Sequence, residues 1–245
     1  MIKLVTDIKQ LDFLGGTPFG CKIISTANAY GLNCKPVMFW AQDFCKAAMA
    51  KVDGSLIIED NGAQTEELAS FINMINPQNI SCLKSTALKL GFPSGSAGEI
   101  MAFQNGKVLT QKYKAVINPG IREIYGLLSA CRTKSFVPPE FEPFYLDMSH
   151  RTRHKAALSA GIKRSGRLVS CAVCTAVSKK AAVISAVSCL PEFRRKGFAS
   201  FAVSSLISLL NRDIVYIFRA DGENENFYRS IGFKPYGFWS ETKIR

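Results

Sequence analysis

The chain has 245 residues, of which 47% are hydrophobic and 20% are charged. This balance is typical of a folded globular protein and excludes a disordered chain. The longest apolar runs, such as residues 201–210, are far shorter than the roughly 20 residues that a membrane span requires. The N-terminus lacks the basic and apolar segments of a secretory signal, so we expect a cytoplasmic protein with no membrane partner.

The formal net charge of +12 is concentrated in one half of the chain. Residues 109–245 hold 22 Lys and Arg against 10 Asp and Glu, whereas residues 1–108 hold 9 of each. A basic field attracts polyanions, so nucleic acid, an anionic membrane and a phosphorylated cofactor all fit the charge alone. The basic stretches lack interleaved aromatic residues for base stacking, and we therefore expect no nucleic-acid partner.

The eight cysteines are scattered mainly among apolar neighbours and are expected to be reduced thiols. The closest pair, Cys171 and Cys174, lies in a run with strand character. Side chains three residues apart on a strand point to opposite faces, so this pair cannot easily hold one ion. Because no second pair follows at zinc-ribbon spacing, we expect no metal site.

Residues 1–108 are expected to form a separate α/β domain, although its elements are weakly marked. Alternating apolar residues predict strands, and the Asp53-Gly54 pair predicts a hairpin turn. In chain order, the predicted elements are strands at 36–41 and 45–59, a helix at 66–75, a strand at 79–84, a turn-rich boundary region at 92–98 and a connection at 99–110.

Residues 109–245 mark their elements more sharply and are predicted to form the second domain. Ser178-Lys179-Lys180 joins two β-rich runs as a hairpin would, and the apolar positions of residues 199–210 fall on one helical face. The predicted elements are a strand at 113–118, helices at 121–131 and 141–150, strands at 155–161, 167–177 and 181–190, a helix at 199–210, a strand at 214–219, a helix at 223–231 and a strand at 235–239.

The segment from Val183 to Ser200 carries the clearest chemical signal. A strand ends at Pro191, and the chain turns through a loop of the form Arg194-x-x-Gly197-x-Ala199 into a helix. The first N–H groups of a helix have no internal acceptor, and the helix dipole adds partial positive charge there. Small residues let the backbone approach a bulky anion, so this strand, loop and helix predict a cradle for a pyrophosphate.

Two segments of this half resemble the motifs of a known family. Pro191-Glu-Phe-Arg-Arg-Lys-Gly-Phe-Ala199 resembles motif A of the GNAT superfamily of N-acetyltransferases, and Asn226-Phe-Tyr-Arg-Ser-Ile-Gly-Phe233 resembles its motif B. The resemblance implies an α/β (α+β) fold, with a mixed twisted sheet flanked by helices and a catalytic domain at 109–245. Leu-Gly-Phe at 90–92 echoes Ile-Gly-Phe at 231–233, which suggests that residues 1–108 are a smaller, degenerate GNAT-like copy in tandem.

The resemblance also implies an activity and a set of site residues. Acetyl-CoA would be the cofactor, and an acetyl group would pass to a primary amine by direct attack through a tetrahedral intermediate. Tyr228 falls on the general acid of the family, and a strand amide near Val187 to Cys189 would stabilise the oxyanion. The implied cofactor-binding residues are Val187, Ser188, Cys189, Arg194, Arg195, Lys196, Gly197, Phe198, Ala199, Ser200, Asn224 and Phe227.

Two departures from the family pattern leave alternatives open. Asp221 stands where many members have Asn, with Asn224 as a substitute, and the strand at 181–190 has no Asp or Glu to act as a base. Asp147, His150, His154 or a chain of water molecules remain candidates for the base. The missing base also fits a catalytically inactive acyl-CoA-binding regulatory module.

The acceptor amine leaves no motif in the sequence, and its identity stays open. Residues 1–108 contain no Arg-x-x-Gly-x-Ala loop, so we expect no CoA there. We expect this half to cover part of the acceptor side or to mediate association, for example as a homodimer.

Overall fold

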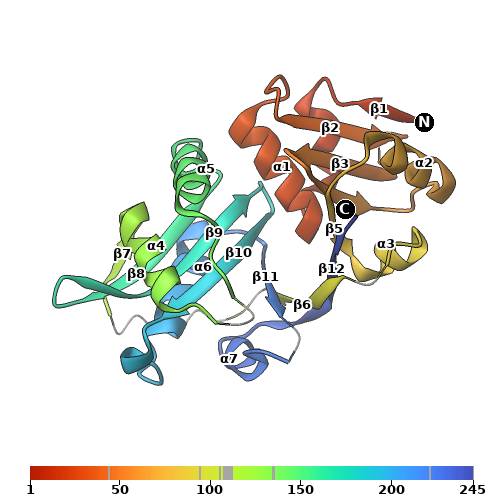
Figure 1. Cartoon of the computed structure of the whole chain (residues 1–245). Coiled ribbons are helices and arrows are strands. Elements are labelled where there is room, and N and C mark those ends of the chain that lie inside the picture. The colour runs from red at the N-terminus through yellow and green to blue at the C-terminus, as the bar shows by residue number, and fades with distance from the viewer. Residues whose placement is uncertain are drawn as a thin grey trace.

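The computed structural model describes residues 1–43, 45–93, 95–104, 106, 113–133, 136–220 and 222–244. These residues form one mixed, twisted sheet of 12 strands flanked by helices, which confirms the predicted fold class (Figure 1). The predicted boundary between residues 108 and 109 lies outside the described residues. None of the helices in the described part of the chain is long and apolar enough to cross a membrane.

The N-terminal half contains strands β1 to β6 and helices α1 to α3. The predicted hairpin at Asp53-Gly54 and the helix at 66–75 are confirmed. The elements are β1 (Ile2–Leu4), a 3-10 helix (Ile8–Leu14), α1 (Pro18–Tyr30), β2 (Val37–Gln42), β3 (Ala47–Val52), β4 (Ser55–Asp60), α2 (Thr65–Ile75), β5 (Asn79–Leu83), α3 (Lys84–Lys89) and β6 (Ser96–Phe103).

The C-terminal half follows the predicted order of elements. The strand predicted at 155–161 begins three residues later, because the preceding helix continues to Arg153. The elements are β7 (Ala115–Ile117), α4 (Ile121–Ala130), α5 (Phe141–Arg153), β8 (Leu158–Arg164), β9 (Arg167–Val177), β10 (Ala181–Cys189), a 3-10 helix (Pro191–Phe193), α6 (Phe198–Leu210), β11 (Ile214–Ala220), α7 (Glu225–Ser230) and β12 (Lys234–Lys243).

The two halves exchange one strand each at the centre of the sheet. The strand order is β1-β2-β3-β4-β5-β12-β6-β11-β10-β9-β8-β7, so β6 lies between β11 and β12, while β12 lies between β5 and β6. Each half repeats the same path, because β4 and β10 each run parallel to the strand that follows a helix, β5 or β11. The structure is therefore a duplicated unit in which neither half completes its sheet with its own strands.

Strand β6 begins inside the turn-rich region predicted at 92–98 and fills the start of the connection predicted at 99–110, so the loop character expected for residues 96–103 is wrong. Its Gly and Ser content resembles a loop, but partners on both sides hold it extended. A Cβ at Gly98 would lie 2.0 Å from the Arg219 carbonyl oxygen, so glycine is needed where the backbone of β11 comes close. Pairing with residues more than a hundred positions away decides this strand, and no local pattern reports it.

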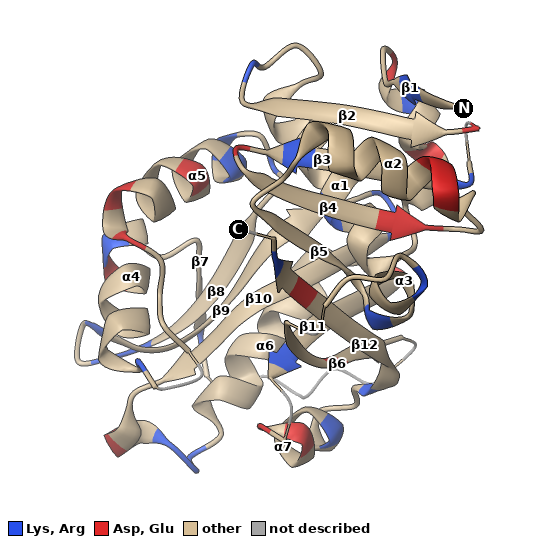
Figure 2. Cartoon of the chain, turned by 45° about the vertical axis from the view of Figure 1, so that its right-hand side comes forward, with Lys and Arg blue, Asp and Glu red and all other residues tan. Residues whose placement is uncertain are grey.

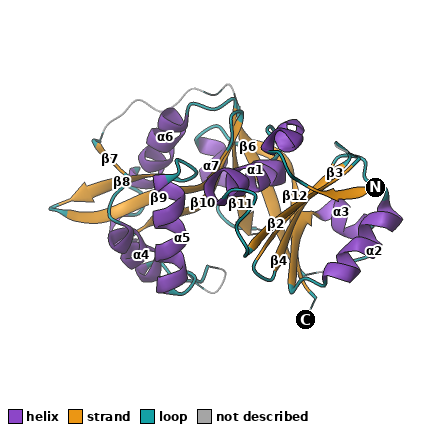
Figure 3. Cartoon of the chain, turned by 90° about the horizontal axis from the view of Figure 1, so that it is seen from above, coloured by secondary structure: helices purple, strands orange, loops and turns teal. Residues whose placement is uncertain are grey.

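Helix α1 has no counterpart among the predicted elements, and it joins the two halves (Figures 1 and 3). Most of its residues are buried, so it lacks the polar face whose spacing would mark a helix. Phe19 packs in one core with Val183 and Tyr216 of the C-terminal half. Ser25 Oγ donates to the Ala156 carbonyl at 3.2 Å. Helix α6 covers one face of the C-terminal strands, and α4 and α5 cover the other (Figure 3).

Candidate functional site

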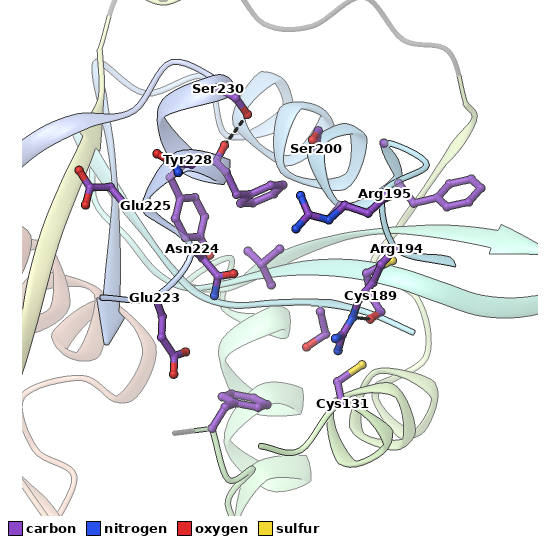
Figure 4. Close-up of a pocket in the computed structure, with 18 of the residues that line it drawn as sticks. Cys131, Cys189, Arg194, Arg195, Ser200, Glu223, Asn224, Glu225, Tyr228 and Ser230 are labelled. Atoms are coloured by element: carbon purple, nitrogen blue, oxygen red, sulfur yellow. Dashed lines mark hydrogen bonds between the residues drawn. The ribbon is translucent and has the colours of Figure 1, made fainter. Parts of the chain in front are cut away.

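A cavity of about 1090 Å³ opens where β10 and β11 separate (Figure 4). These strands pair only from Ala181 to Ile184, whereas β10 stays paired with β9 as far as Cys189. The sheet therefore opens into a wedge between β10, α6 and α7. The cavity is lined by Cys131, Thr133, Phe136, Val187, Ser188, Cys189, Phe193, Arg194, Arg195, Gly197, Phe198, Ala199, Ser200, Gly222, Glu223, Asn224, Glu225, Asn226, Phe227, Tyr228 and Ser230.

The open edge of β10 presents backbone groups to this wedge. Leu190 N donates to Val169 O on β9 at 3.0 Å. Because backbone groups of successive residues alternate between the two edges of a strand, Ser188 also faces β9, and Val187 and Cys189 direct their N–H groups to the open side. These two amides are therefore available to an oxygen atom in the cavity.

The loop before α6 leaves a run of backbone amides without acceptors. Phe201 N donates to Gly197 O, but no amide from Arg195 to Ser200 donates to any group in the described part of the chain. Arg195 and Gly197 have φ angles of 60° and 83°, which turn the backbone into the helix. Unpaired amides at a helix start attract an anion, so this geometry suits the predicted cradle.

The three basic side chains of this loop have different surroundings. Arg195 extends from the α6 side into the cavity toward α7 (Figure 4). Arg194 also lines the cavity, and its Nε donates to the Cys189 carbonyl at 3.1 Å. Lys196 does not line the cavity: its Nζ donates to the Glu192 carbonyl at 2.9 Å. Of the predicted site residues, Lys196 alone is absent from the cavity wall.

The opposite wall comes from α7 and the loop before it. Tyr228 is buried against Phe227 and Phe233, with ring centroids 4.9 and 5.8 Å away. Burial raises the pKa of its hydroxyl above the ordinary value, and the Arg219 charge opposes this only partly. Asn224 and Phe227 lie on the same wall. Asp221, whose counterpart in the family motif is Asn, lies outside the described residues.

None of the three side chains considered as a base lines the cavity. Asp147, His150 and His154 belong to α5 and its end, at the contact with α1. Tyr30 Oη donates to Asp147, and the His150 Nε2 atom lies 2.7 Å from the Ala29 carbonyl oxygen. Asp147 and His150 thus contact the N-terminal half, and the His154 ring packs against His150 with centroids 4.4 Å apart.

A carboxylate that the sequence analysis missed does line the cavity. Glu223 makes no side-chain hydrogen bond or ion pair with any described residue. Its neighbour Glu225, in contrast, accepts from Arg219 at 3.1 Å and from Arg229 at 2.7 Å. The only sequence signal for Glu223 is its place in the short loop between a strand and motif B.

The equivalent loop of the N-terminal half holds its own anion. Asp60 Oδ1 accepts from Gly62 N at 3.0 Å and from Ala63 N at 2.7 Å, and Lys89 donates to the other carboxylate oxygen. The next amide, of Gln64, donates to a glutamine side chain at 2.8 Å. Acidic residues gather at the end of β4 and in α2 (Figure 2). The equivalent loop of the C-terminal half, before α6, is basic instead.

The counterpart of Tyr228 in this half is Ala87, because each lies four residues before the glycine of a Gly-Phe pair.

No three or more His, Cys, Asp or Glu side chains gather as metal ligands within the described ranges.

Comparison with known proteins finds a family model that matches part of the C-terminal half. Residues 121–233 match the model of the acetyltransferase (GNAT) family. Similar solved structures include a Drosophila protein (TM-score 0.64, 11% identity, covering 99% of this chain and 98% of that chain) and a GNAT-family acetyltransferase from Colwellia psychrerythraea (0.59, 12%, 100% of both).

A tandem GNAT protein from the clavulanic acid biosynthesis pathway is also similar (0.57, 12%, 98% of this chain and 97% of that chain). These likenesses show a GNAT-like fold over the whole chain, in line with the tandem arrangement that the sequence predicts. Among proteins of curated function, no sequence matches significantly.

The conformation of Gly197 yields a prediction about stability. At φ 83° an Ala side chain is strained, although its Cβ would come no closer than 3.5 Å to another atom. We expect Gly197→Ala to lower the free energy of unfolding by about 1 kcal/mol, measured by urea denaturation. The control is Gly126→Ala in the middle of α4, which we expect to raise it by about 1 kcal/mol. Equal effects of the same sign would contradict the left-handed conformation of Gly197.

Proposed function

We propose that the chain transfers an acetyl group from acetyl-CoA to a primary amine, as the match of residues 121–233 to the acetyltransferase (GNAT) family model suggests. The observation that carries the proposal is the run of free amides from Arg195 to Ser200 at the edge of the cavity. A pyrophosphate is the part of CoA that such a run would hold. The cavity is large enough for the remaining arm to pass along β10 toward the wedge.

The residues of the chain fit this cofactor at both ends of the cavity. The amides before α6 and the Arg195 guanidinium would bind the pyrophosphate oxygens. The open edge of β10 would hold the pantetheine arm through the backbone of Val187 and Cys189. When bound, acetyl-CoA supplies an acyl group that is already activated as a thioester.

Two groups in the wedge suit acyl transfer. The amides of Val187 and Cys189 point to the open side of β10; the one beside the acyl group would donate to the carbonyl oxygen that gains negative charge, while the other holds the arm, and a fixed donor to that oxygen lowers the barrier. Tyr228 would give its proton to the departing thiolate. Since burial raises its pKa, the hydroxyl stays protonated up to and beyond the ordinary tyrosine value of about 10, so activity is not lost through this group as pH rises to that point.

Glu223 is the carboxylate best placed to take a proton from the acceptor. An alkyl amine has a pKa of about 10.4 and is charged at neutral pH. A free carboxylate on the cavity wall would attract this ammonium ion and accept its proton, directly or through water. Glu223 thereby takes the role left open by the absence of an acidic residue on β10.

Tyr228→Phe tests the acid. We expect the turnover number to fall by about a hundredfold, because the leaving thiolate loses its proton donor, while the affinity for CoA stays nearly constant. Turnover is measured by thiol release with acetyl-CoA and the best acceptor from a screen of primary amines. Tyr145→Phe, in α5 outside the cavity, is the control. Unchanged turnover would show that Tyr228 has a packing role only, whereas CoA binding without turnover of any amine would support the regulatory module.

Glu223→Gln tests the base. We expect a decrease of about a hundredfold in kcat/KM for the amine at pH 7 and a smaller one near pH 10, because solvent then deprotonates the amine. The pH profile of kcat/KM measures both. Glu192→Gln removes a carboxylate that is paired with Arg167 outside the cavity, and its profile should match that of the parent. A Glu223 variant with an unaltered profile would exclude this role.

Arg195→Gln and Lys196→Gln test the cradle, because they remove equal charges from adjacent positions of which only one lines the cavity. We expect Arg195→Gln to weaken CoA binding about tenfold and Lys196→Gln to leave it nearly unchanged. Isothermal titration calorimetry gives the dissociation constants of both variants. For the full chain it should also give one CoA per chain, because Asp60 fills the N-terminal loop. Two sites per chain, or equal losses in the two variants, would refute this account.

A further inference from the structure

Arg219 on β11 connects the N-terminal half to the site. Arg219 and Glu99 are only 7% and 8% exposed, and they face each other directly across β11 and β6. The Arg219 Nε donates to Glu99 Oε2 at 2.8 Å, and Nη2 contacts the same oxygen. Because β6 is the strand that the N-terminal half inserts, this buried ion pair exists only when the two halves are assembled.

The same guanidinium holds the loop between β11 and α7. Its Nη1 donates to the carbonyl oxygens of Ala220 and Glu223, at 3.3 and 3.2 Å. Its Nη2 also contacts Glu225 Oε2 at 3.1 Å, in the first turn of α7. One side chain therefore bonds to both ends of the loop that carries Glu223 and Asn224 to the cavity wall (Figure 4).

This loop contains two residues with left-handed backbone conformations. Gly222 and Asn224 have φ angles of 71° and 57°, in the left-handed region. The loop begins at the end of the strand β11 and leads into α7, a helix of only six residues. Without Glu99 the buried guanidinium keeps only the more exposed Glu225 carboxylate as a charged partner, so the Arg219 side chain would shift toward other acceptors or water.

We propose that Glu99 is a positioning residue for the acceptor side of the site: through Arg219, it fixes the loop that places the Glu223 carboxylate in the cavity. The part of this inference that concerns the reaction rests on the proposed function. The N-terminal half thus contributes a residue to the order of the site, although none of its described residues lines the cavity. The charge of Arg219 also acts on Tyr228, whose pKa it lowers against the larger effect of burial.

Glu99→Gln in the full chain tests the proposal by hydrogen exchange. We expect amides of residues 222–230 to exchange about tenfold faster and those of residues 195–200 to keep their rates. The affinity for CoA should stay constant while kcat/KM for the amine falls by about tenfold or more. Asp147→Asn is the matched control, because it alters another polar contact between the halves, with Tyr30, that does not reach the cavity.

Arg219→Lys is the second variant, since it keeps the charge but cannot bond to Glu99 and both carbonyls together. It should reproduce the local increase in exchange even if Glu99→Gln loosens the whole chain. Unchanged exchange at 222–230 in both variants, or an equal change in Asp147→Asn, would overturn the proposal. Hydrogen exchange is measured without any acyl transfer. An inactive parent protein would therefore count against the proposed function, whereas the exchange rates of residues 222–230 would still decide the positioning role.

Discussion

The exchange of β6 and β12 is the constraint on which the rest of the structure depends. Each strand completes the sheet of the other half, and the two pair with each other along the centre. A strand in the middle of a sheet satisfies its backbone groups on both edges, so either half alone would leave such an edge open. The N-terminal half is therefore part of the framework on which β11, the loop after it and α7 are placed.

The duplicated unit has kept one anion cradle and closed the other. In both halves a strand leads through a short loop into a helix whose first amides lack internal acceptors. In the N-terminal half the carboxylate of Asp60 satisfies these amides from within the chain. In the C-terminal half the amides from Arg195 to Ser200 stay free beside a cavity and two arginines. The same backbone geometry thus holds an internal carboxylate in one half and leaves its amides free in the other, according to which charge the loop itself carries.

Local chemistry explains why the cradle could be predicted from the sequence and other features could not. The strand, Gly197 and helix α6 follow one another within residues 181–210, so their local pattern predicts their geometry. Strand β6 depends on partners far away in the chain, and α1 is buried on most sides, so neither has a periodic signal.

The direction of side chains is the second feature that could not be predicted from the sequence. The sequence assigns Arg195 and Lys196 the same role, yet only Arg195 enters the cavity. Glu223 becomes a candidate only from the structure. Its carboxylate has no partner among the described residues, whereas that of Glu225 has two. The candidates His150 and Asp147 were plausible by residue type, but the contact with α1 uses them instead.

The central claim is that the main-chain amides ahead of α6 bind the pyrophosphate of CoA. Amide-resolved NMR of the full chain during titration with CoA tests it most directly, because each N–H group reports its own environment. We expect large shifts for Arg195 to Ser200 that saturate at one equivalent, with no change at Gly62 to Gln64. Unshifted signals from Arg195 to Ser200, in a sample that binds CoA, would contradict it.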